Sequence, residues 1–233
     1  MTGRIAHIPR ILTDGTATWT AEGAEIASDA PTGDQLVLTP KKLANVVSLS
    51  RESIEDAPVN ELDAVGTALT RSVAAAIDAR AFSAAAATAL EPAGLRSYAI
   101  PAQTGGVNID NVIRAAGTVG TYGAIAGAVF INPADLTTLR LVKDTAGRPL
   151  LQPDLQAGGA ERIAGATLYP TANLPAGTAL VGDDAQVVVG VRRDIEVAFS
   201  ADAKFTADSV AARVTARADF GINDIRGLVA IGA

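Results

Sequence analysis

Side chains that could perform acid–base, nucleophilic or metal chemistry are few in this sequence. The 233 residues include one histidine, His7, and no cysteine. A Ser-His-Asp triad, a Cys-His pair or a multi-histidine metal site therefore has at most one histidine to use. Catalysis by carboxylates stays formally open, but no pair of acids stands out from turn chemistry. The sequence thus predicts no catalytic residues and a protein that is not an enzyme.

Three patterns that resemble ligand sites are better explained as turns or loops. The glycine-rich stretch at 117–123 follows a helical pattern rather than a strand, and it lacks the Lys-Ser/Thr of a phosphate-binding loop. Adjacent acids at 183–184 follow a strand-like run, where acids are typical of a turn. Glu25, Asp29 and Asp34 carry the oxygen ligands that Ca²⁺ prefers, but without the spacing of a calcium loop. We therefore expect no cofactor and no metal.

The composition limits the partners that the chain can bind. Hydrophobic residues make up 48% of the sequence, aromatic residues only 4%, and the formal net charge is −6. An acidic surface gains no affinity by neutralising phosphates, so tight or sequence-specific nucleic-acid binding is not expected. The sequence contains no run of about 18 apolar residues, so we expect no transmembrane helix and no membrane partner.

A long amphipathic helix is predicted from residue 60 to about residue 87. Asn60 is placed to cap its first amide groups, and Asp63 adds negative charge at the positive end of the helix dipole. The alanines at 84–87 favour helix, so no clear end is predicted. We expect its apolar face to pack on strands within 191–217. That face is formed at spacings of three or four by Leu62, Val65, Leu69, Val73 and Ile77.

The segment before this helix is predicted to form a protruding β-hairpin. Strand-like runs cover 4–12, 17–21 and 36–49, and a polar stretch at 22–35 forms the tip. A two-stranded hairpin has too little hydrophobic surface to be stable alone, so it must lie on its own body or on a neighbour. Trp19, the only tryptophan, is expected in the core at the base of the hairpin, with an interface anchor as the alternative.

The remaining pattern mixes helices with strands, which makes the fold class α+β. Short helices are expected at 50–56 and 108–119. A further helix begins at Asn132 and Pro133, where the asparagine caps and the proline lacks an amide that would go unpaired, and it ends at 144–147. Strands are expected at 128–131, 162–170, 179–183, 187–191, 195–199, 210–221 and 228–231.

Several stretches occur in an order and at a spacing found in one known family. They are ATWTAEG at 17–23, the lead into the long helix at 43–58, IDARAF at 77–82, PAGL at 92–95 and the NPAD-to-GRPL region at 132–150, with looser matches at 163–165 and 181–183. Together these stretches resemble the HK97-like major capsid protein family of tailed bacteriophages, whose fold is shared with encapsulins.

The resemblance implies an HK97-like capsid fold with an extended β-hairpin arm, a long spine helix, and peripheral and axial domains. The implied parts are an N-terminal segment with the extended loop at 1–49, a peripheral domain with the spine helix at 50–99, an axial domain at 100–190, and a return to the peripheral domain with a C-terminal strand at 191–233. The candidates for subunit contacts are Glu22, Gly23, Glu25, Asp29, Asp34, Lys41, Lys42, Arg51, Glu55, Arg71, Asp78, Arg80, Arg192 and Arg193.

Two features depart from the family pattern. The founding phage cross-links its subunits through a lysine in the extended loop, whereas residues 22–38 contain no lysine, so that isopeptide bond cannot form there. Asp208 falls near the position of the acceptor asparagine. The usual glycine-rich turn after the spine helix is replaced by the alanines at 84–87.

The function that the resemblance implies is structural. Copies of the chain would self-assemble as pentamers and hexamers into an icosahedral shell that encloses phage double-stranded DNA without sequence-specific binding. The shell would be the virion capsid, assembled in the cytoplasm of a host bacterium, with portal, scaffold or decoration proteins as further partners. An encapsulin-type compartment around a cargo enzyme is the alternative within this fold, and a carboxylate-dependent hydrolase is the remote alternative.

Overall fold

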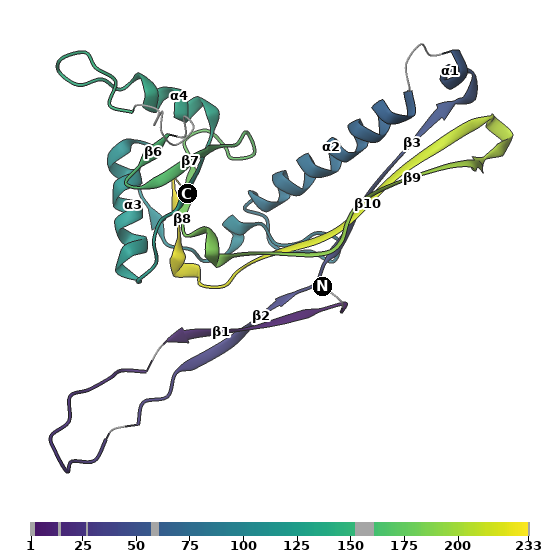
Figure 1. Ribbon diagram of the computed structural model, residues 1–233. Helices are drawn as coiled ribbons and strands as arrows, with labels where there is room; N and C mark the ends of the chain where they lie inside the picture. Colours follow the sequence, from purple (N-terminus) through teal and green to yellow (C-terminus); the bar gives the residue numbers. More distant parts are fainter. Residues whose placement is uncertain (1–2, 14, 27, 57–60, 152–160, 233) are drawn as a thin grey trace.

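The computed structural model describes residues 3–13, 15–26, 28–56, 61–151 and 161–232. Its three parts are a projecting arm, a long helix on a three-stranded sheet, and a six-stranded sheet with helices beside it (Figure 1). Helices and strands alternate irregularly along the chain, so the predicted α+β class is confirmed. Within the described ranges, no helix is long and apolar enough to cross a membrane.

The long helix α2 (Glu61–Ala81) packs on one face of the three-stranded sheet. The strand order is β3 (Lys41–Ser50), β10 (Ser209–Ile222) and β9 (Val187–Lys204), all antiparallel. The core between helix and sheet contains the buried residues Leu69, Val73, Ala212, Val214 and Ala216. This contact confirms the apolar face predicted for the helix and its predicted partner strands. The two strands expected at 187–191 and 195–199 are one continuous strand, β9.

The end of α2 differs from the prediction that the helix continues to about residue 87. The helix stops at Ala81, because a returning segment supplies other partners for the backbone that follows. The amide of Gly94 donates to the carbonyl of Ala85 at 3.0 Å, and the amide of Arg96 donates to the carbonyl of Ser83 at 3.3 Å. Alanine exceeds most residues in helix propensity by well under about 1 kcal/mol, so such tertiary bonds override it. The predicted cap, Asn60, lies outside the described residues.

Gly94 makes the closest approach in this return, and its replacement provides a test. A Cβ atom at residue 94 would lie 2.1 Å from the carbonyl oxygen of Ser83, whereas one at Gly117, exposed on a helix, would meet no described atom within 4 Å. We expect Gly94→Ala to lower the free energy of unfolding by about 1–3 kcal/mol. The matched variant Gly117→Ala should raise it by about 0.5–1 kcal/mol. Urea unfolding of the unassembled chains measures both free energies. Equal effects of the two substitutions would contradict the close approach of Gly94 to Ser83.

The six-stranded sheet carries the largest core, with α3 (Ile109–Thr121) and α4 (Pro133–Leu141) packed against it. Its strand order is β4 (Ala102–Gln103), β11 (Leu228–Ile231), β8 (Ala179–Gly182), β5 (Ala128–Ile131), β7 (Ala166–Pro170) and β6 (Arg162–Ile163). The predicted C-terminal strand is therefore β11, and it lies between β4 and β8 of this sheet. Wholly buried residues in the core include Val112, Val119, Val129, Ile131 and Val181.

Both helices of this part begin where the sequence predicts and end elsewhere. The side chains of Asn108 and Asn132 accept backbone hydrogen bonds of 2.7 and 2.9 Å in the first turns of α3 and α4. The helix α3 includes residues 117–121, so most of the glycine-rich stretch is helix rather than the predicted loop. The helix α4 ends at Leu141, before a separate turn at 144–147 that the side chain of Asp144 holds through two backbone amides.

The arm is an antiparallel hairpin of β1 (Ala6–Thr13) and β2 (Thr32–Leu38) that projects from the rest of the chain (Figure 1). Two expectations about its strands are wrong. Residues 17–21 form no strand, and the run at 36–49 is divided into β2 and β3. The division falls before Pro40, which has no amide to donate to a strand ladder. The arm is therefore shorter in its paired part and longer in its tip than expected.

Candidate subunit-contact surfaces

The tip loop of the arm, residues 15–31, is exposed at every described position. Trp19 lies on this loop and is wholly exposed, at 106% of its reference accessible area. The prediction of a core position at the base of the hairpin is therefore wrong. The strands pair only as far as Thr13 and Thr32, so Trp19 lies beyond the last pair and has no sheet surface to cover it.

The same loop carries acidic residues and no basic ones. Glu22 and Glu25 are exposed on either side of Gly23, whose φ of +77° allows the turn between them. Asp29 accepts a hydrogen bond from the amide of Thr16 at 2.8 Å, which closes the neck of the loop. The structure thus places four of the predicted contact residues together at the tip, with two carboxylates directed to solvent.

Asp34 lies in the paired part of the arm and is engaged within the chain. Its partner in the β1–β2 register is Arg10, and the two side chains form a bidentate ion pair with distances of 2.8 and 2.7 Å. The hydrogen bond from Arg10 lowers the pKa of the Asp34 carboxyl below its ordinary value. Arg10 also donates to the carbonyl of Ile222 at 3.2 Å, so this pair connects the arm to the end of β10.

Acid is expected to loosen the arm through this pair. The pKa of Asp34 is lower in the folded chain than its ordinary value of 3.8. The ion pair therefore stabilises the folded arm at a pH above 3.8, and this stabilisation is lost as the pH falls through the lowered pKa of the folded chain. The carboxylate is largely exposed, so solvent weakens the effect and confines it to the arm. Hydrogen exchange of β1 and β2 amides, corrected for intrinsic rates, should quicken below about pH 4. Asp34→Asn should show that faster exchange already at neutral pH; exchange equal to the parent there would contradict the role of the pair.

Candidates on the helices differ in whether they are available to a neighbour. Arg51 begins the short helix α1 (Arg51–Asp56), as expected for 50–56, and forms an exposed 3.0 Å ion pair with Asp208. Glu55, Arg71 and Asp78 are exposed. Arg80 is mostly covered, because its guanidinium donates to the carbonyls of Pro92 and Ala86 at 2.7 and 2.9 Å and pairs with Glu91 at 3.1 Å. Arg80 therefore secures the segment that follows α2.

A basic surface lies on the face of the three-stranded sheet that α2 leaves uncovered. Side chains alternate along β10, so Arg213 and Arg217 point away from the helix core. The register places Arg217 opposite both Lys42 on β3 and Arg193 on β9. Like charges directly opposite one another destabilise a sheet, so this row favours an acidic partner. We define the basic surface as the cations that line two adjoining depressions: Arg4, Lys41, Lys42, Arg192, Arg193, Arg213 and Arg217.

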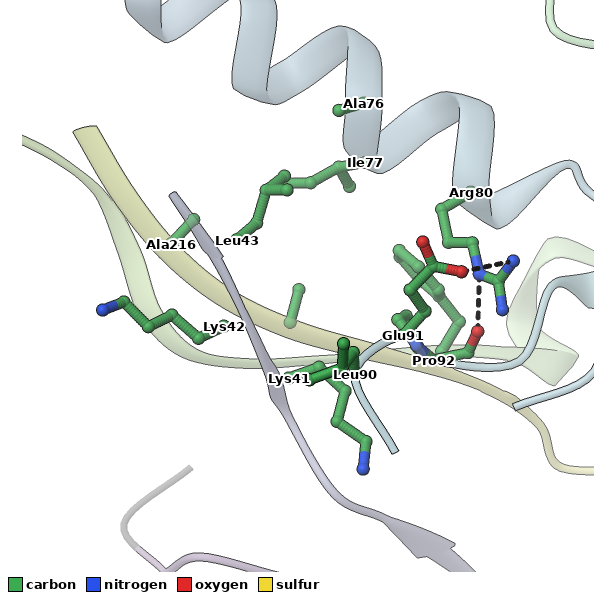
Figure 2. Close-up of a pocket in the computed structure, with 12 residues that line it drawn as sticks. Lys41, Lys42, Leu43, Ala76, Ile77, Arg80, Leu90, Glu91, Pro92 and Ala216 are labelled. Atoms are coloured by element: carbon green, nitrogen blue, oxygen red, sulfur yellow. Dashed lines mark hydrogen bonds and ion pairs between the residues drawn. The ribbon is translucent and has the colours of Figure 1, made fainter. Parts of the chain in front are cut away.

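An apolar pocket of about 170 Å³ opens beside this surface, between α2 and the start of β3 (Figure 2). Leu43 and Ile77 line it, and Lys41 and Lys42 point outward from its edge. The ion pair of Arg80 with Glu91 also lines it. Leu90, which is 81% exposed, extends the apolar surface at its mouth. The remaining apolar lining comes from Ala76, Pro92, Ala216, Ala218 and Phe220. The pocket and the basic surface share the two lysines.

Sequence reasoning missed the pocket and three of the seven cations of the basic surface, Arg4, Arg213 and Arg217. Alternation along 210–221 was a sufficient signal to place Arg213 and Arg217 on the polar face of a strand. Their grouping with Lys42 and Arg193 depends on the register between strands distant in sequence, which no local pattern specifies. The pocket depends on where α2 stops, and no local pattern marks that end.

Among the described residues, no group of three or more His, Asp or Glu side chains is placed to hold a metal ion. His7 is exposed on the arm and hydrogen-bonds the side chain of Gln35 at 2.9 Å. The notable features are surfaces: an acidic loop with an exposed tryptophan, a basic sheet face and an apolar pocket.

Comparison with known proteins identifies the fold. The sequence model of the phage capsid family matches residues 2–232. No curated protein matches the chain. A solved structure from Mycobacterium phage Bobi is 21% identical, with a TM-score of 0.80 over 100% of this chain and 86% of that chain. One from Mycobacterium phage Adephagia is 20% identical, with a TM-score of 0.79 and coverage of 99% and 85%. The capsid of the native GTA particle is 17% identical, with a TM-score of 0.79 and the same coverage.

Proposed function

Because the chain belongs to the phage capsid family, we propose that its copies form pentamers and hexamers of an icosahedral shell that encloses phage double-stranded DNA. The chain is a structural capsid protein and not an enzyme. It self-associates into a capsid, which is its place in the virion. The proposal adds the symmetry of the shell, its DNA content, and assembly in the cytoplasm of the host bacterium.

The projecting arm is the observation that carries the proposal. A two-stranded hairpin is marginal in water, and the tip loop is exposed throughout its described length. A surface on one copy that fits a different surface on the next copy makes a heterologous contact, which closes into rings when the rotation permits. The arm supplies such a contact, since it extends beyond the body that it leaves (Figure 1). We assign residues 50–99 and 191–222 to the peripheral domain, and residues 100–190 with β11 to the axial domain.

The charges support enclosure of DNA without sequence-specific binding. The net charge of −6 disfavours tight binding of the DNA phosphates by the chain as a whole. The predicted contact residues Lys41, Lys42, Arg192 and Arg193 fall on the basic surface, and we assign that surface to subunit contacts. Portal, scaffold or decoration proteins are further partners of the proposed shell.

Negative-stain microscopy and light scattering of the purified chain test this function. We expect closed shells with five- and six-fold clusters, and nuclease-protected double-stranded DNA inside shells isolated from infected cells. A strictly monomeric chain under all assembly conditions would contradict the proposal. Shells that hold a cargo protein and no DNA would instead support the encapsulin-type compartment.

A further inference from the structure

Trp19 is the first of two features that the shell function alone does not explain. A tryptophan buries 150–250 Å² when it packs, and it is among the residues most enriched at the energetic centres of interfaces. Here the side chain is wholly exposed on an acidic loop. Nothing in the described part of the chain covers it, so its apolar surface is available to a second molecule.

The apolar pocket is the second feature. A cavity of about 150 Å³ in another protein is large enough to hold a benzene ring. The pocket between α2 and β3 has about 170 Å³, opens to solvent, and continues onto the exposed side chain of Leu90. Its size and lining suit one aromatic side chain rather than a polar ligand. The lining acid Glu91 is already paired with Arg80 at 3.1 Å, whereas Lys41 and Lys42 point outward from the edge, so the group that enters should carry acidic neighbours (Figure 2).

We propose that Trp19 of one copy inserts into this pocket of a neighbouring copy, while the acids of the same tip loop lie on the basic surface beside it. This inference rests on the proposed shell function and specifies the contact that the arm makes there. The occupant is a second copy of this chain, because both the tryptophan and the matching charges are present on its own arm.

Charge and spacing support the match. Glu22 and Glu25 follow Trp19 by three and six residues. An extended chain spans at most about 3.5 Å per residue, so Glu22 lies within about 10 Å of Trp19. The two lysines line the pocket itself, so an acid this near to the tryptophan would lie close to them.

The row formed by Lys42, Arg217 and Arg193 begins at this edge of the pocket and continues across the sheet. Arg193 is already paired with Glu196 of its own chain at 3.7 Å. Carboxylates of the tip loop would therefore act mainly on Lys42 and Arg217, where they would relieve the remaining repulsion.

Two other occupants are disfavoured. The arm of the same chain projects away from α2, so its own tip would have to fold back over the body (Figure 1). Nucleic acid would pair with the cations of the basic surface but has no aliphatic or indole side chain for the apolar pocket. A contact between DNA and the basic surface would appear in the fluorescence experiment below as a change that requires added DNA.

The fluorescence of Trp19 reports on the pocket directly, since the chain has no other tryptophan. Emission of the unassembled chain should be that of a water-exposed indole, readily quenched by iodide. In shells assembled from nuclease-treated protein, we expect a shift to shorter wavelength and at least about a threefold loss of iodide quenching, because a filled pocket excludes the quencher. Shells in which Trp19 remains exposed overturn the inference and leave the proposed function standing. A shift that requires added DNA assigns the loop to a DNA contact and also overturns it.

A pair of alanines on α2 provides a variant and its matched control. Ala76 lines the pocket and Ala75 does not, and both are exposed on the helix. Ala76→Phe should fill the pocket from its own chain, reduce shell yield at least about tenfold and leave Trp19 exposed when the variant is studied alone. Ala75→Phe should assemble as the parent does. Equal yields from the two variants would overturn the inference, and failure of the parent itself to form shells would contradict the proposed function.

Discussion

A chain whose tip loop is replaced by a two-residue Asn-Gly turn is expected to fold and to form no shells. The replacement joins Thr13 to Thr32, which are paired at the end of the arm, and Asn-Gly suits the tight turn of such a hairpin. It removes Trp19 together with every acidic residue between positions 14 and 31. If the arm makes the contact that links neighbouring copies, loss of shells should be complete rather than partial, because every contact of that kind in the assembly is lost at once.

Folding of this variant is expected to be unaffected. Every described residue of the tip loop is exposed, and the arm root is retained with its buried residues Leu36 and Leu38. Circular dichroism should show unchanged secondary structure, and the midpoint of urea unfolding should match that of the unassembled parent. A second variant, with a tip loop of the original length made of Gly and Ser, keeps the length of the arm but removes its side-chain contacts. This variant should also form no shells. Normal shells from either variant would rule out the role assigned to the arm.

The parts of the fold that could be predicted are those specified by neighbouring residues. Asn108 and Asn132 cap their helices because a short polar side chain can reach the first free amides, whatever surrounds it. The apolar face of α2 and the alternation of β10 follow from the helix and strand periods, and the two faces meet as expected. The resemblance to capsid proteins depended on the order of such local features along the chain.

The parts that could not be predicted depend on residues distant in sequence. The alanines at 84–87 favour helix locally, yet the amide of Gly94 bonds the carbonyl of Ala85, the amide of Arg96 bonds that of Ser83, and the helix stops. Trp19 has the large apolar side chain that is typical of a core residue. Only the pairing of Thr13 with Thr32 shows that it lies beyond the sheet. The basic surface requires the register of β10 with both of its neighbours. A contact surface of this kind is therefore visible only once the strands are placed.

The direction in which the arm leaves the body is expected to depend on Asp219. This carboxylate is 8% exposed, at the point where β10 passes the link between β2 and β3. One of its oxygens accepts from the amide of Thr39 at 2.6 Å, and the other accepts from the amide of Phe220 at 2.8 Å. Because Pro40 follows, Thr39 is held in extended backbone, and the bond from Asp219 fixes that residue against β10.

Asp219→Ala should lower the free energy of unfolding by about 2–4 kcal/mol, since two covered amides lose their acceptor and each costs about 1–3 kcal/mol. The loop-replaced chain is the right background, because assembly would add its own stabilisation. Asp208→Asn is the control: it removes a charge at the other end of β10 whose exposed ion pair with Arg51 is worth below about 1 kcal/mol. Asparagine also tolerates the φ of +41° at this residue. Hydrogen exchange in β1 and β2 should quicken only in Asp219→Ala, and in the full chain the freed arm should reduce shell yield. Equal unfolding and exchange in the two variants would show that the arm is fixed by its leucines alone, since Leu36 and Leu38 pack over Gly221 independently of the carboxylate.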